Sequence, residues 1–295
     1  MLALAATLAA GALAGPAAPA PIVLVDDQGR TVALPGPARR AVTLAPHATE
    51  LAWAAGAGRY LVATVAASDW PPPARALPRI GDGLQPDPER IAAQRPDLVI
   101  GWKTGRLDPA ASALGQLGVP LYVSAPARLA DIPAAVRAYG RLFGTEDQAE
   151  AAAALLQRRL DALAATPRPG PPLRVFVQAG QQPVYTLNGE HIVSDAIALC
   201  GGANVFAGLP AAAPRVSVEG VLAARPDVVV ATAGAGADPA AEWRRAGLPA
   251  ALAGRVHVLD ADTLYRPGPR LVDAAERLCA LLDGVRAQRR SPPAL

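Results

Sequence analysis

Hydrophobic and polar positions follow the same order in two separate parts of the chain. Residues 89–100 read Glu-Arg-Ile-Ala-Ala-Gln-Arg-Pro-Asp-Leu-Val-Ile, and residues 219–230 read Glu-Gly-Val-Leu-Ala-Ala-Arg-Pro-Asp-Val-Val-Val. Each copy predicts a short helix opened by an acidic residue, a tight Arg-Pro-Asp turn that ends it, and an apolar strand of the kind buried on both faces of a parallel sheet. The identical spacing within the two copies indicates two similar α/β lobes.

Short apolar runs elsewhere predict the other strands of these lobes. They alternate with helical patterns and turn residues, as expected of βα units. A small hairpin with Gly29 in its turn is predicted near the start, and a loop is predicted over 262–270. The predicted strands are 22–25, 31–34, 40–44, 61–65, 98–100, 121–123, 173–177, 228–230 and 255–259.

A long helical segment divides the chain. Residues 134–143 predict one amphipathic helix, and Thr145 and Gln148 have the spacing of a capping box that opens a second helix reaching about residue 165. The proline-rich residues 166–172 end it. We therefore predict an N-terminal lobe over 21–140, a bridging helix over 141–168, a C-terminal lobe over 169–286 and a tail over 287–295. A single rigid helix predicts small relative motions of the lobes.

Residues 1–20 form an apolar run of small residues. Ala14 and Ala20 each end a small-x-small triplet, so we predict a secretory signal peptide over 1–20 with cleavage after one of these two alanines. The run is too short, and too soon interrupted by Pro16, to span a bilayer as a helix. The alternative is a buried N-terminal helix, because the usual positively charged start is missing.

Composition narrows the classes of function. With 52% hydrophobic residues among 295, the chain can bury one large core or two domain-sized cores. The net charge of +3 comes from arginine, since Lys103 is the only lysine, and the arginine pairs are scattered rather than gathered in a stripe. We therefore expect no nucleic-acid partner.

Cys200 and Cys279 are the only cysteines, and each follows an apolar helical stretch in the second half of the chain. In a reducing cytosol they would be two buried thiols, whereas in an exported protein an even number favours a disulfide. Such a bond would stabilise the fold by about 4 kcal/mol in the chain-entropy model.

Catalytic motifs are missing from the sequence. It has no Gly-x-Ser-x-Gly elbow, Walker loop, His-Glu-x-x-His or Cys-x-x-Cys motif, so we predict a protein that is not an enzyme, with no cofactor and no bound metal. The alternative is an α/β enzyme acting between the lobes, for which His47, Glu50 and Asp262 are the acid/base candidates.

Aromatic residues are scarce, at 4%, and four of them lie where predicted strands end. The carboxyl ends of parallel strands form one edge of a sheet, so two facing lobes would place these rings around a common cleft. The alternative is that each ring covers the core of its own lobe. His47 lies at a strand-to-helix junction of the same kind. The four aromatic residues are Trp70, Trp102, Tyr185 and Tyr265.

Glu89 and Glu219 open the helices of the two repeat copies. A carboxylate in a first helical turn interacts favourably with the helix dipole, which by itself explains an acidic residue there. Equivalent exposed glutamates on both lobes would also suit docking to a symmetric, basic partner. The sequence alone leaves both interpretations open.

An ordered set of motifs resembles the periplasmic vitamin B12-binding proteins of cobalamin ABC importers. The resemblance covers roughly residues 38–283, and several of the motifs also occur in haem- and siderophore-binding relatives. The motifs are Leu-Ala-Pro-His-Ala-Thr-Glu-Leu at 44–51, Ser-Asp-Trp-Pro-Pro at 68–72, Pro-Glu-Arg-Ile at 88–91, Arg-Pro-Asp-Leu-Val-Ile-Gly-Trp at 95–102, Leu-Cys-Gly-Gly-Ala-Asn-Val-Phe at 199–206 and Arg-Pro-Gly-Pro-Arg at 266–270.

This resemblance implies two Rossmann-like α/β lobes joined by a single long helix, with a disulfide between Cys200 and Cys279. It implies a monomeric periplasmic protein that captures cobalamin or a related corrinoid and delivers it to the permease dimer of an ABC importer. Cobalamin would be a transported ligand and not a cofactor. The alternative ligand is haem or a ferric siderophore, and for haem His47 or Tyr185 would be the axial ligand.

The resemblance also implies individual roles. Ligand contacts are expected at Trp70 and along the segment before the Arg-x-x-Pro-Arg motif, and Trp102 and Tyr185 match further aromatic positions. Glu89 and Glu219 match glutamates that pair with arginines of the permease. Where members of the family carry further tryptophans before each repeat copy, this chain has Gly83 and approximately Ala213. The segment is Asp262, Thr263, Leu264, Tyr265 and Arg266.

Overall fold

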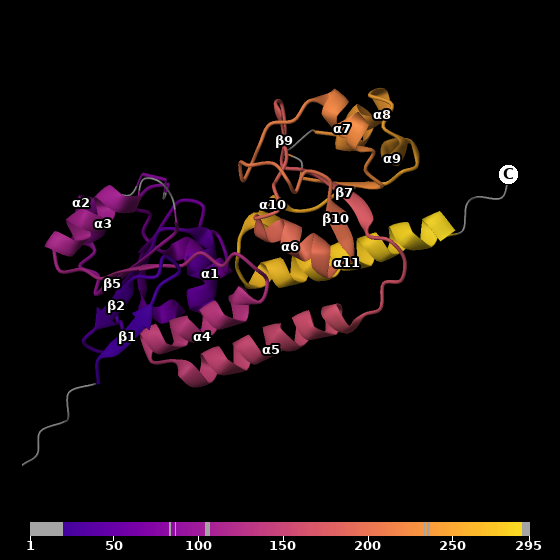
Figure 1. The fold of residues 1–295 in the computed structure, drawn as a ribbon. Coiled ribbons are helices and arrows are strands. Elements are labelled where there is room, and N and C mark those ends of the chain that lie inside the picture. The colour runs from indigo at the N-terminus through magenta and orange to yellow at the C-terminus, as the bar shows by residue number, and fades with distance from the viewer. Residues whose placement is uncertain are drawn as a thin grey trace, which may run out of the picture.

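Two α/β lobes lie side by side above a long helix in Figure 1. The computed structural model describes residues 20–290 except 83, 86, 104–106, 233 and 235–236, and it describes no side chains for 107–110. Residues 1–19 of the predicted signal peptide, and Gly83, therefore lie outside the described residues. Within the described part of the chain, no helix is both long enough and apolar enough to cross a membrane.

The N-terminal lobe begins with the predicted hairpin, in which β1 and β2 pair antiparallel. A four-stranded parallel sheet with its helices follows. The elements are β1 (Ile22–Val25), β2 (Thr31–Leu34), β3 (Ala41–Thr43), α1 (Pro46–Ala54), β4 (Leu61–Thr64), α2 (Pro88–Ala93), β5 (Leu98–Gly101), α3 (Leu107–Gln116), β6 (Leu121–Val123) and α4 (Asp131–Phe143), with short 3₁₀ helices at Gly58–Tyr60 and Pro72–Ala76.

The C-terminal lobe has a second four-stranded parallel sheet and a separate two-stranded hairpin, β8–β9. The elements are β7 (Leu173–Gln178), β8 (Gly180–Gln181), β9 (Val184–Tyr185), α6 (Ile192–Leu199), β10 (Gly202–Asn204), α7 (Val218–Ala224), β11 (Val228–Ala231), α8 (Pro239–Arg245), α9 (Pro249–Leu252), β12 (Val256–Val258), α10 (Ala261–Tyr265) and α11 (Pro269–Arg290).

The two sheets have the same topology. Their strand orders are β4-β3-β5-β6 and β10-β7-β11-β12, with every pair parallel. Counted within each sheet, both orders are second, first, third, fourth. The chain direction across the sheet therefore switches between the first and third strands, and open parallel sheets bind ligands at the carboxyl ends of the strands at such a point.

The Arg-Pro-Asp turn of the first repeat copy joins α2 to the sheet. The Asp97 carboxylate accepts hydrogen bonds from the backbone N–H groups of Arg39 and Arg40 at 2.8 and 3.0 Å. The Arg40 guanidinium donates in turn to the carbonyl oxygens of Gln94 and Arg95 at the end of α2. Arg95 has a φ of 48°, a left-handed conformation that ends the helix.

The second copy repeats these contacts in the other lobe. The Asp227 carboxylate accepts from the Arg174 N–H at 2.9 Å, and the Arg174 guanidinium donates to the carbonyl oxygens of Ala224 and Arg225. Arg225 also has a positive φ, of 42°. The duplication predicted from sequence is therefore a duplication of hydrogen bonds as well as of elements.

The bridging helix is α5 (Glu146–Ala165), which packs against α4 of the first lobe and α11 of the second. Its buried residues recur at helical spacing and belong to one continuous core that includes residues of both lobes. The guanidinium of Arg159 binds Asp273 and Glu276 of α11 at 2.5 and 2.7 Å. The residues of the buried face are Ala149, Ala153, Leu156 and Leu160.

The predicted capping box at the start of α5 is not formed. Thr145 precedes the helix, but its side chain makes no capping hydrogen bond, and its hydroxyl is buried without a hydrogen-bond partner among the described residues. Glu146 and Asp147 supply negative charge in the first turn instead, where it interacts favourably with the helix dipole.

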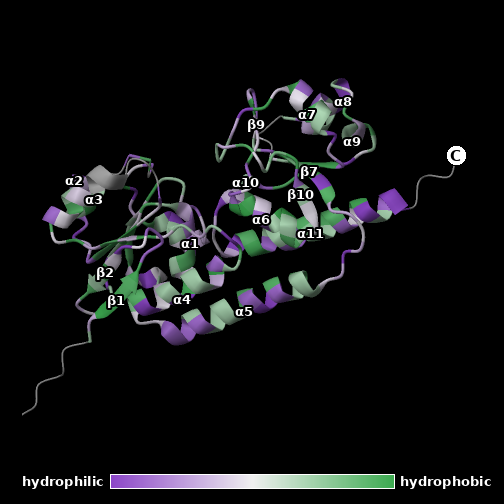
Figure 2. Ribbon diagram, viewed as in Figure 1, coloured by the Kyte–Doolittle hydropathy of each residue, from purple (hydrophilic) through white to green (hydrophobic). Residues whose placement is uncertain are grey.

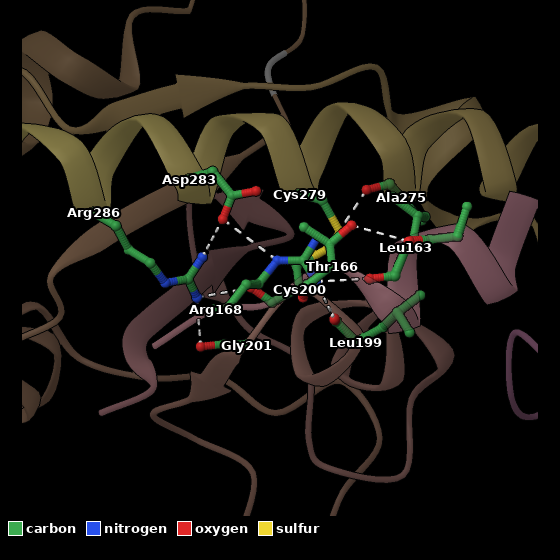
Figure 3. The surroundings of a disulfide bond; sticks show 11 residues. Leu163, Thr166, Arg168, Leu199, Cys200, Gly201, Ala275, Cys279, Asp283 and Arg286 are labelled. Carbon is green, nitrogen blue, oxygen red and sulfur yellow. Dashed lines mark hydrogen bonds and ion pairs between the residues drawn. A yellow bond between two sulfur atoms is a disulfide. The ribbon is translucent and has the colours of Figure 1, made fainter. Parts of the chain in front are cut away.

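A disulfide joins Cys200, directly after α6, to Cys279 in the middle of α11, which confirms the expected pairing (Figure 3). Arg286 donates to the carbonyl oxygens of Cys200 and Gly201 at 2.8 and 2.7 Å and pairs with Asp283 (Figure 3). These bonds tie the last part of α11 to the end of α6, and α11 continues through residues 287–290, which the sequence assigned to the tail. Figure 2 shows this end of α11 as hydrophilic.

Candidate functional site

The switch point of the first sheet brings together His47 and Trp102. His47 lies in the first turn of α1, which follows β3, and Trp102 directly follows β5. The two rings meet edge to face, with centroids 5.6 Å apart and planes at 75°. Trp102 is 42% exposed and His47 is 2% exposed. The tryptophan thus presents ring surface to the outside, and the imidazole supports it from within.

The His47 ring is buried and makes a hydrogen bond within the protein. Its Nε2 lies 3.0 Å from the Ser124 carbonyl oxygen at the end of β6. Burial lowers the pKa of His47 to about 4, a trend that the Ser124 hydrogen bond opposes and the charge of Arg266 reinforces. The ring is therefore neutral at pH 7 and donates its Nε2 proton to Ser124. Direct contact between His47 and a ligand, expected from the sequence, stays a prediction, and the described contacts of the ring are with Ser124 and Trp102.

Trp70 lies in the loop after β4, beside the prolines of the Ser-Asp-Trp-Pro-Pro motif, and is 42% exposed. The guanidinium carbon of Arg270, from the start of α11, lies 5.2 Å from the centroid of its ring. Arg270 belongs to the other lobe. One side of the Trp70 ring is therefore covered by a cation, and the exposed remainder is available as a flat apolar surface.

A buried cluster of hydroxyl groups anchors the loop that carries Trp70. Neighbouring oxygens in this cluster lie 2.7 to 3.0 Å apart. The cluster joins the ends of two strands and a helix to the first residue of the Ser-Asp-Trp motif, so it fixes the loop onto the sheet. Its members are Thr43 of β3, Thr49 of α1, Thr64 of β4 and Ser68 of the loop.

Arg266 connects the two lobes beside this loop. Its guanidinium binds Asp69 and Asp262 at 2.7 Å each and lies 3.5 Å from Glu50. Partial burial would raise the pKa of Asp69, but the hydrogen bond and charge of Arg266 outweigh it and hold that pKa below its usual value. The sequence placed Asp262 and Arg266 at the ligand, and the structure shows them bound to each other at the lobe junction.

The rest of the segment 262–266 divides between core and surface. It is not the predicted loop, because the Asp260 side chain accepts from the Thr263 N–H and caps the short helix α10. Leu264 is fully buried, so it packs in the core instead of facing a ligand. The Thr263 hydroxyl donates back to the Asp260 carbonyl oxygen, and the Tyr265 hydroxyl lies 3.0 Å from Thr232 Oγ1.

Two tyrosines of the C-terminal lobe have different surroundings. Tyr185, at the end of β9, is 36% exposed, and none of the described contacts ties it to the Arg266 network. Tyr265 meets the ring of His191 edge to face at 6.3 Å. A cavity of about 450 Å³ lies at the lobe junction beside His191, lined also by Arg128 from the first lobe and Asp195 from the second.

Glu50, Asp69 and Arg270 are site residues that the sequence did not assign to ligand binding. Glu50 is almost fully buried and makes two hydrogen bonds to Arg270, 220 residues away along the chain. Burial raises the pKa of Glu50 despite the opposing effects of Arg270 and Arg266. The motif at 266–270 is visible in the sequence. No local pattern in it, or in the helix that carries Glu50, predicts that these two segments meet.

The two repeat glutamates are exposed in the first turns of equivalent helices. Glu89 follows Asp87, which caps α2, and Glu219 follows Ser217, which caps α7. The pKa of Glu219 is lowered by backbone and Ser217 hydrogen bonds. Neither carboxylate forms an ion pair within the described part of the chain. In that part, no group of three or more His, Cys, Asp or Glu side chains is arranged to hold a metal ion.

Comparison with known proteins adds independent evidence. The family model described as periplasmic binding protein matches residues 41–263. A vitamin B12-binding protein of Vibrio cholerae serotype O1 is 37% identical over 253 residues, which cover 85% of this chain and 91% of that protein.

Solved structures show the same likeness. The periplasmic vitamin B12 binding protein BtuF of Vibrio cholerae has a TM-score of 0.79 and 35% identity, covering 85% of this chain and 98% of that one. The apo form of the periplasmic haem-binding protein RhuT from Roseiflexus sp. RS-1 has a TM-score of 0.73 and 27% identity, covering 84% and 98%. These similarities confirm the predicted pair of α/β lobes joined by a long helix. The chain belongs to the periplasmic binding protein family, whose members bind and deliver solutes and are not enzymes.

Proposed function

We propose that this protein binds cobalamin or a related corrinoid at the lobe junction and delivers it to an ABC importer. The observation that carries the proposal is the set of exposed aromatic rings at strand ends of both lobes, Trp70, Trp102 and Tyr185. A corrin is a broad, largely apolar ring edged with amides. Aromatic faces with a few polar groups beside them suit such a ligand.

Charge at the junction supports a corrinoid over an anionic ligand. Arg266 and Arg270 are both paired with carboxylates of this chain, and the cluster holds three carboxylates against two guanidiniums. These arginines are therefore already partnered and would have to give up a carboxylate to bind haem propionates. The Vibrio cholerae relative that is 37% identical is a vitamin B12-binding protein, which agrees with a corrinoid ligand.

Haem remains the second candidate because one observation favours it. Tyr185 has an exposed phenol that could ligate haem iron, and a haem-binding protein is among the similar structures. The burial of the His47 ring and the contact of its Nε2 with Ser124 favour Tyr185 over His47 as the axial ligand.

The permease partner and the cellular location are part of the same proposal. The protein acts in the periplasm as a monomer, after removal of the signal peptide predicted over 1–20. Glu89 and Glu219 dock to the two subunits of the permease, and their equivalent, exposed positions on the two lobes support this role.

Titration calorimetry with cyanocobalamin, hydroxocobalamin, cobinamide and haemin tests the proposal. We expect a corrinoid to bind with a Kd below ~10 μM, corresponding to a binding free energy of about −7 kcal/mol. Trp70→Ala should weaken that binding about tenfold, while Trp53→Phe, on a helix away from the strand ends, should not. Absence of corrinoid binding together with a haemin complex that is lost in Tyr185→Phe would replace cobalamin by haem.

A further inference from the structure

Trp70 belongs to one lobe, but its orientation is set by the other. Arg270 covers one side of the ring at 5.2 Å, and the buried carboxylate of Glu50 fixes Arg270 in that place. The two hydrogen bonds from Arg270 to Glu50 measure 3.1 Å from Nε and 2.6 Å from Nη2. Two hydrogen bonds fix the orientation of the guanidinium plane, whereas a single hydrogen bond would let the plane rotate.

Glu50 also reaches the second arginine of the motif. Arg266 Nη1 lies 3.5 Å from Glu50 and 2.7 Å from Asp69, the residue before Trp70. The C-terminal lobe therefore holds the Trp70 loop at two points, through the Asp69 carboxylate and through the Trp70 ring. Among the described residues, Glu50 is the one carboxylate that pairs with both arginines.

The backbone between these arginines packs directly on α1. A Cβ atom at Gly268 would come within 3.4 Å of Glu50 Oε2 and 3.7 Å of His47 Cα. The same helix turn therefore supports Trp102 through His47 and Trp70 through Glu50. Figure 1 shows α11 beginning beside α1, where this packing occurs.

We propose that Glu50 is a positioning residue for ligand binding: by holding Arg270 against one face of Trp70, it presents the opposite face in a fixed orientation before the ligand arrives. Glu50 itself does not touch the ligand. The expected effect on ligand affinity rests on the proposed function, whereas the fixed orientation of the Trp70 ring is a property of the protein without ligand. Preorganisation of this kind improves affinity by removing the cost of ordering the ring on binding.

The structural part is tested without ligand. The four tryptophans are replaced by 5-fluorotryptophan, and the ¹⁹F resonance of Trp70 is identified by its loss in Trp70→Phe. We expect Glu50→Gln to shift or broaden the Trp70 resonance and to leave that of Trp243 unchanged. The matched control is Glu150→Gln, which removes a comparable two-point pair with Arg137 on the surface of α4 and α5. An unchanged Trp70 resonance in Glu50→Gln would overturn the proposal.

The functional part is tested with cyanocobalamin. Glu50→Gln should raise the Kd about tenfold, mainly through faster dissociation, and Glu150→Gln should leave it within twofold. In a Trp70→Ala background Glu50→Gln should have no further effect, because the ring it positions is gone; additive losses would contradict the proposal.

If Glu50→Gln does not fold, Arg270→Lys replaces it. This variant keeps a positive charge beside Glu50 but loses the planar guanidinium over Trp70. It should change the Trp70 resonance with little change in melting temperature, and the opposite pattern would refute the positioning role. Failure of the wild-type protein to bind any corrinoid would refute the proposed function alone, since the ¹⁹F result does not depend on a ligand.

Discussion

Asp97 and Asp227, one in each lobe, both bind the backbone at the start of the first strand of their sheet. The Asp97 carboxylate accepts from the N–H groups of Arg39 and Arg40 just before β3, and the Asp227 carboxylate accepts from the N–H of Arg174 in β7. The backbone N–H groups of the two aspartates donate back to the carbonyl oxygens of Arg40 and Arg174. The two residues differ in burial, because Asp227 also pairs with Arg289 of α11 and is the less exposed.

Removal of these two carboxylates should destabilise the protein to different extents. We expect Asp97→Ala to lower the free energy of unfolding by about 1 kcal/mol and Asp227→Ala by about 2 kcal/mol, since the second also loses a half-buried ion pair. Urea unfolding monitored by circular dichroism measures both. Asp161→Ala, on the exposed face of α5, is the control and should cost less than about 0.5 kcal/mol. Equal losses of unfolding free energy in all three variants would show that the Arg-Pro-Asp turns contribute no more to stability than an exposed helix position.

The neutral His47 ring predicts a pH-dependent stability. Its pKa is about 4 in the folded protein and 6.5 in the unfolded chain, so the unfolded state binds more protons between these values. Stability should therefore be full above pH 6.5 and fall as the pH drops towards 4, by up to about 3 kcal/mol.

His47→Gln should flatten this dependence in urea titrations at pH 7, 6 and 5, while His257→Gln, whose ring is less buried, should change it less. A slope unaltered by His47→Gln would mean that the pKa of His47 is the same in the folded and the unfolded protein.

Gly140 of α4 packs closely against α5. A Cβ atom there would lie 2.4 Å from the Cβ of Ala149, whereas a Cβ at Gly115 in α3 would meet nothing within 4 Å. We expect Gly140→Ala to destabilise by about 1–3 kcal/mol through overpacking, and Gly115→Ala to stabilise by up to about 1 kcal/mol through helix propensity. Thermal unfolding of the two variants compares them directly; a stabilising Gly140→Ala would show that the helices separate without cost.

Glu89 and Glu219, which we propose dock to the permease, should affect transport and not binding. In vesicles containing the permease, the double variant Glu89→Gln with Glu219→Gln should reduce corrinoid uptake at least tenfold while its affinity in solution stays within twofold. Glu146→Gln, an exposed first-turn glutamate of α5, is the matched control and should transport normally. A parallel loss of affinity in the double variant would assign these residues to the ligand site.

Local signals in the sequence predicted the elements that depend on neighbours along the chain. The repeat, the hairpin at Gly29 and the long α5 are of this kind, and the resemblance supplied the Cys200–Cys279 pair. The helix α10 was missed because its start depends on one capping side chain, Asp260, within a stretch rich in turn formers. The burial of Leu264 and the pairing of Glu50 with Arg270 were missed because they follow from how the lobes pack, which no spacing in the sequence encodes.

The connection of the lobes through one core has a kinetic consequence. Because α5 is bound to α4 and to α11, the distance between α2 and α7 is set by the fold, and we expect it to change little when a ligand enters. If Glu89 and Glu219 dock to a permease as proposed, an empty molecule presents it with the same pair of glutamates as a filled one. Empty copies would act as competitive inhibitors of delivery, so the import rate would follow the ratio of filled to empty protein and not the total amount of either.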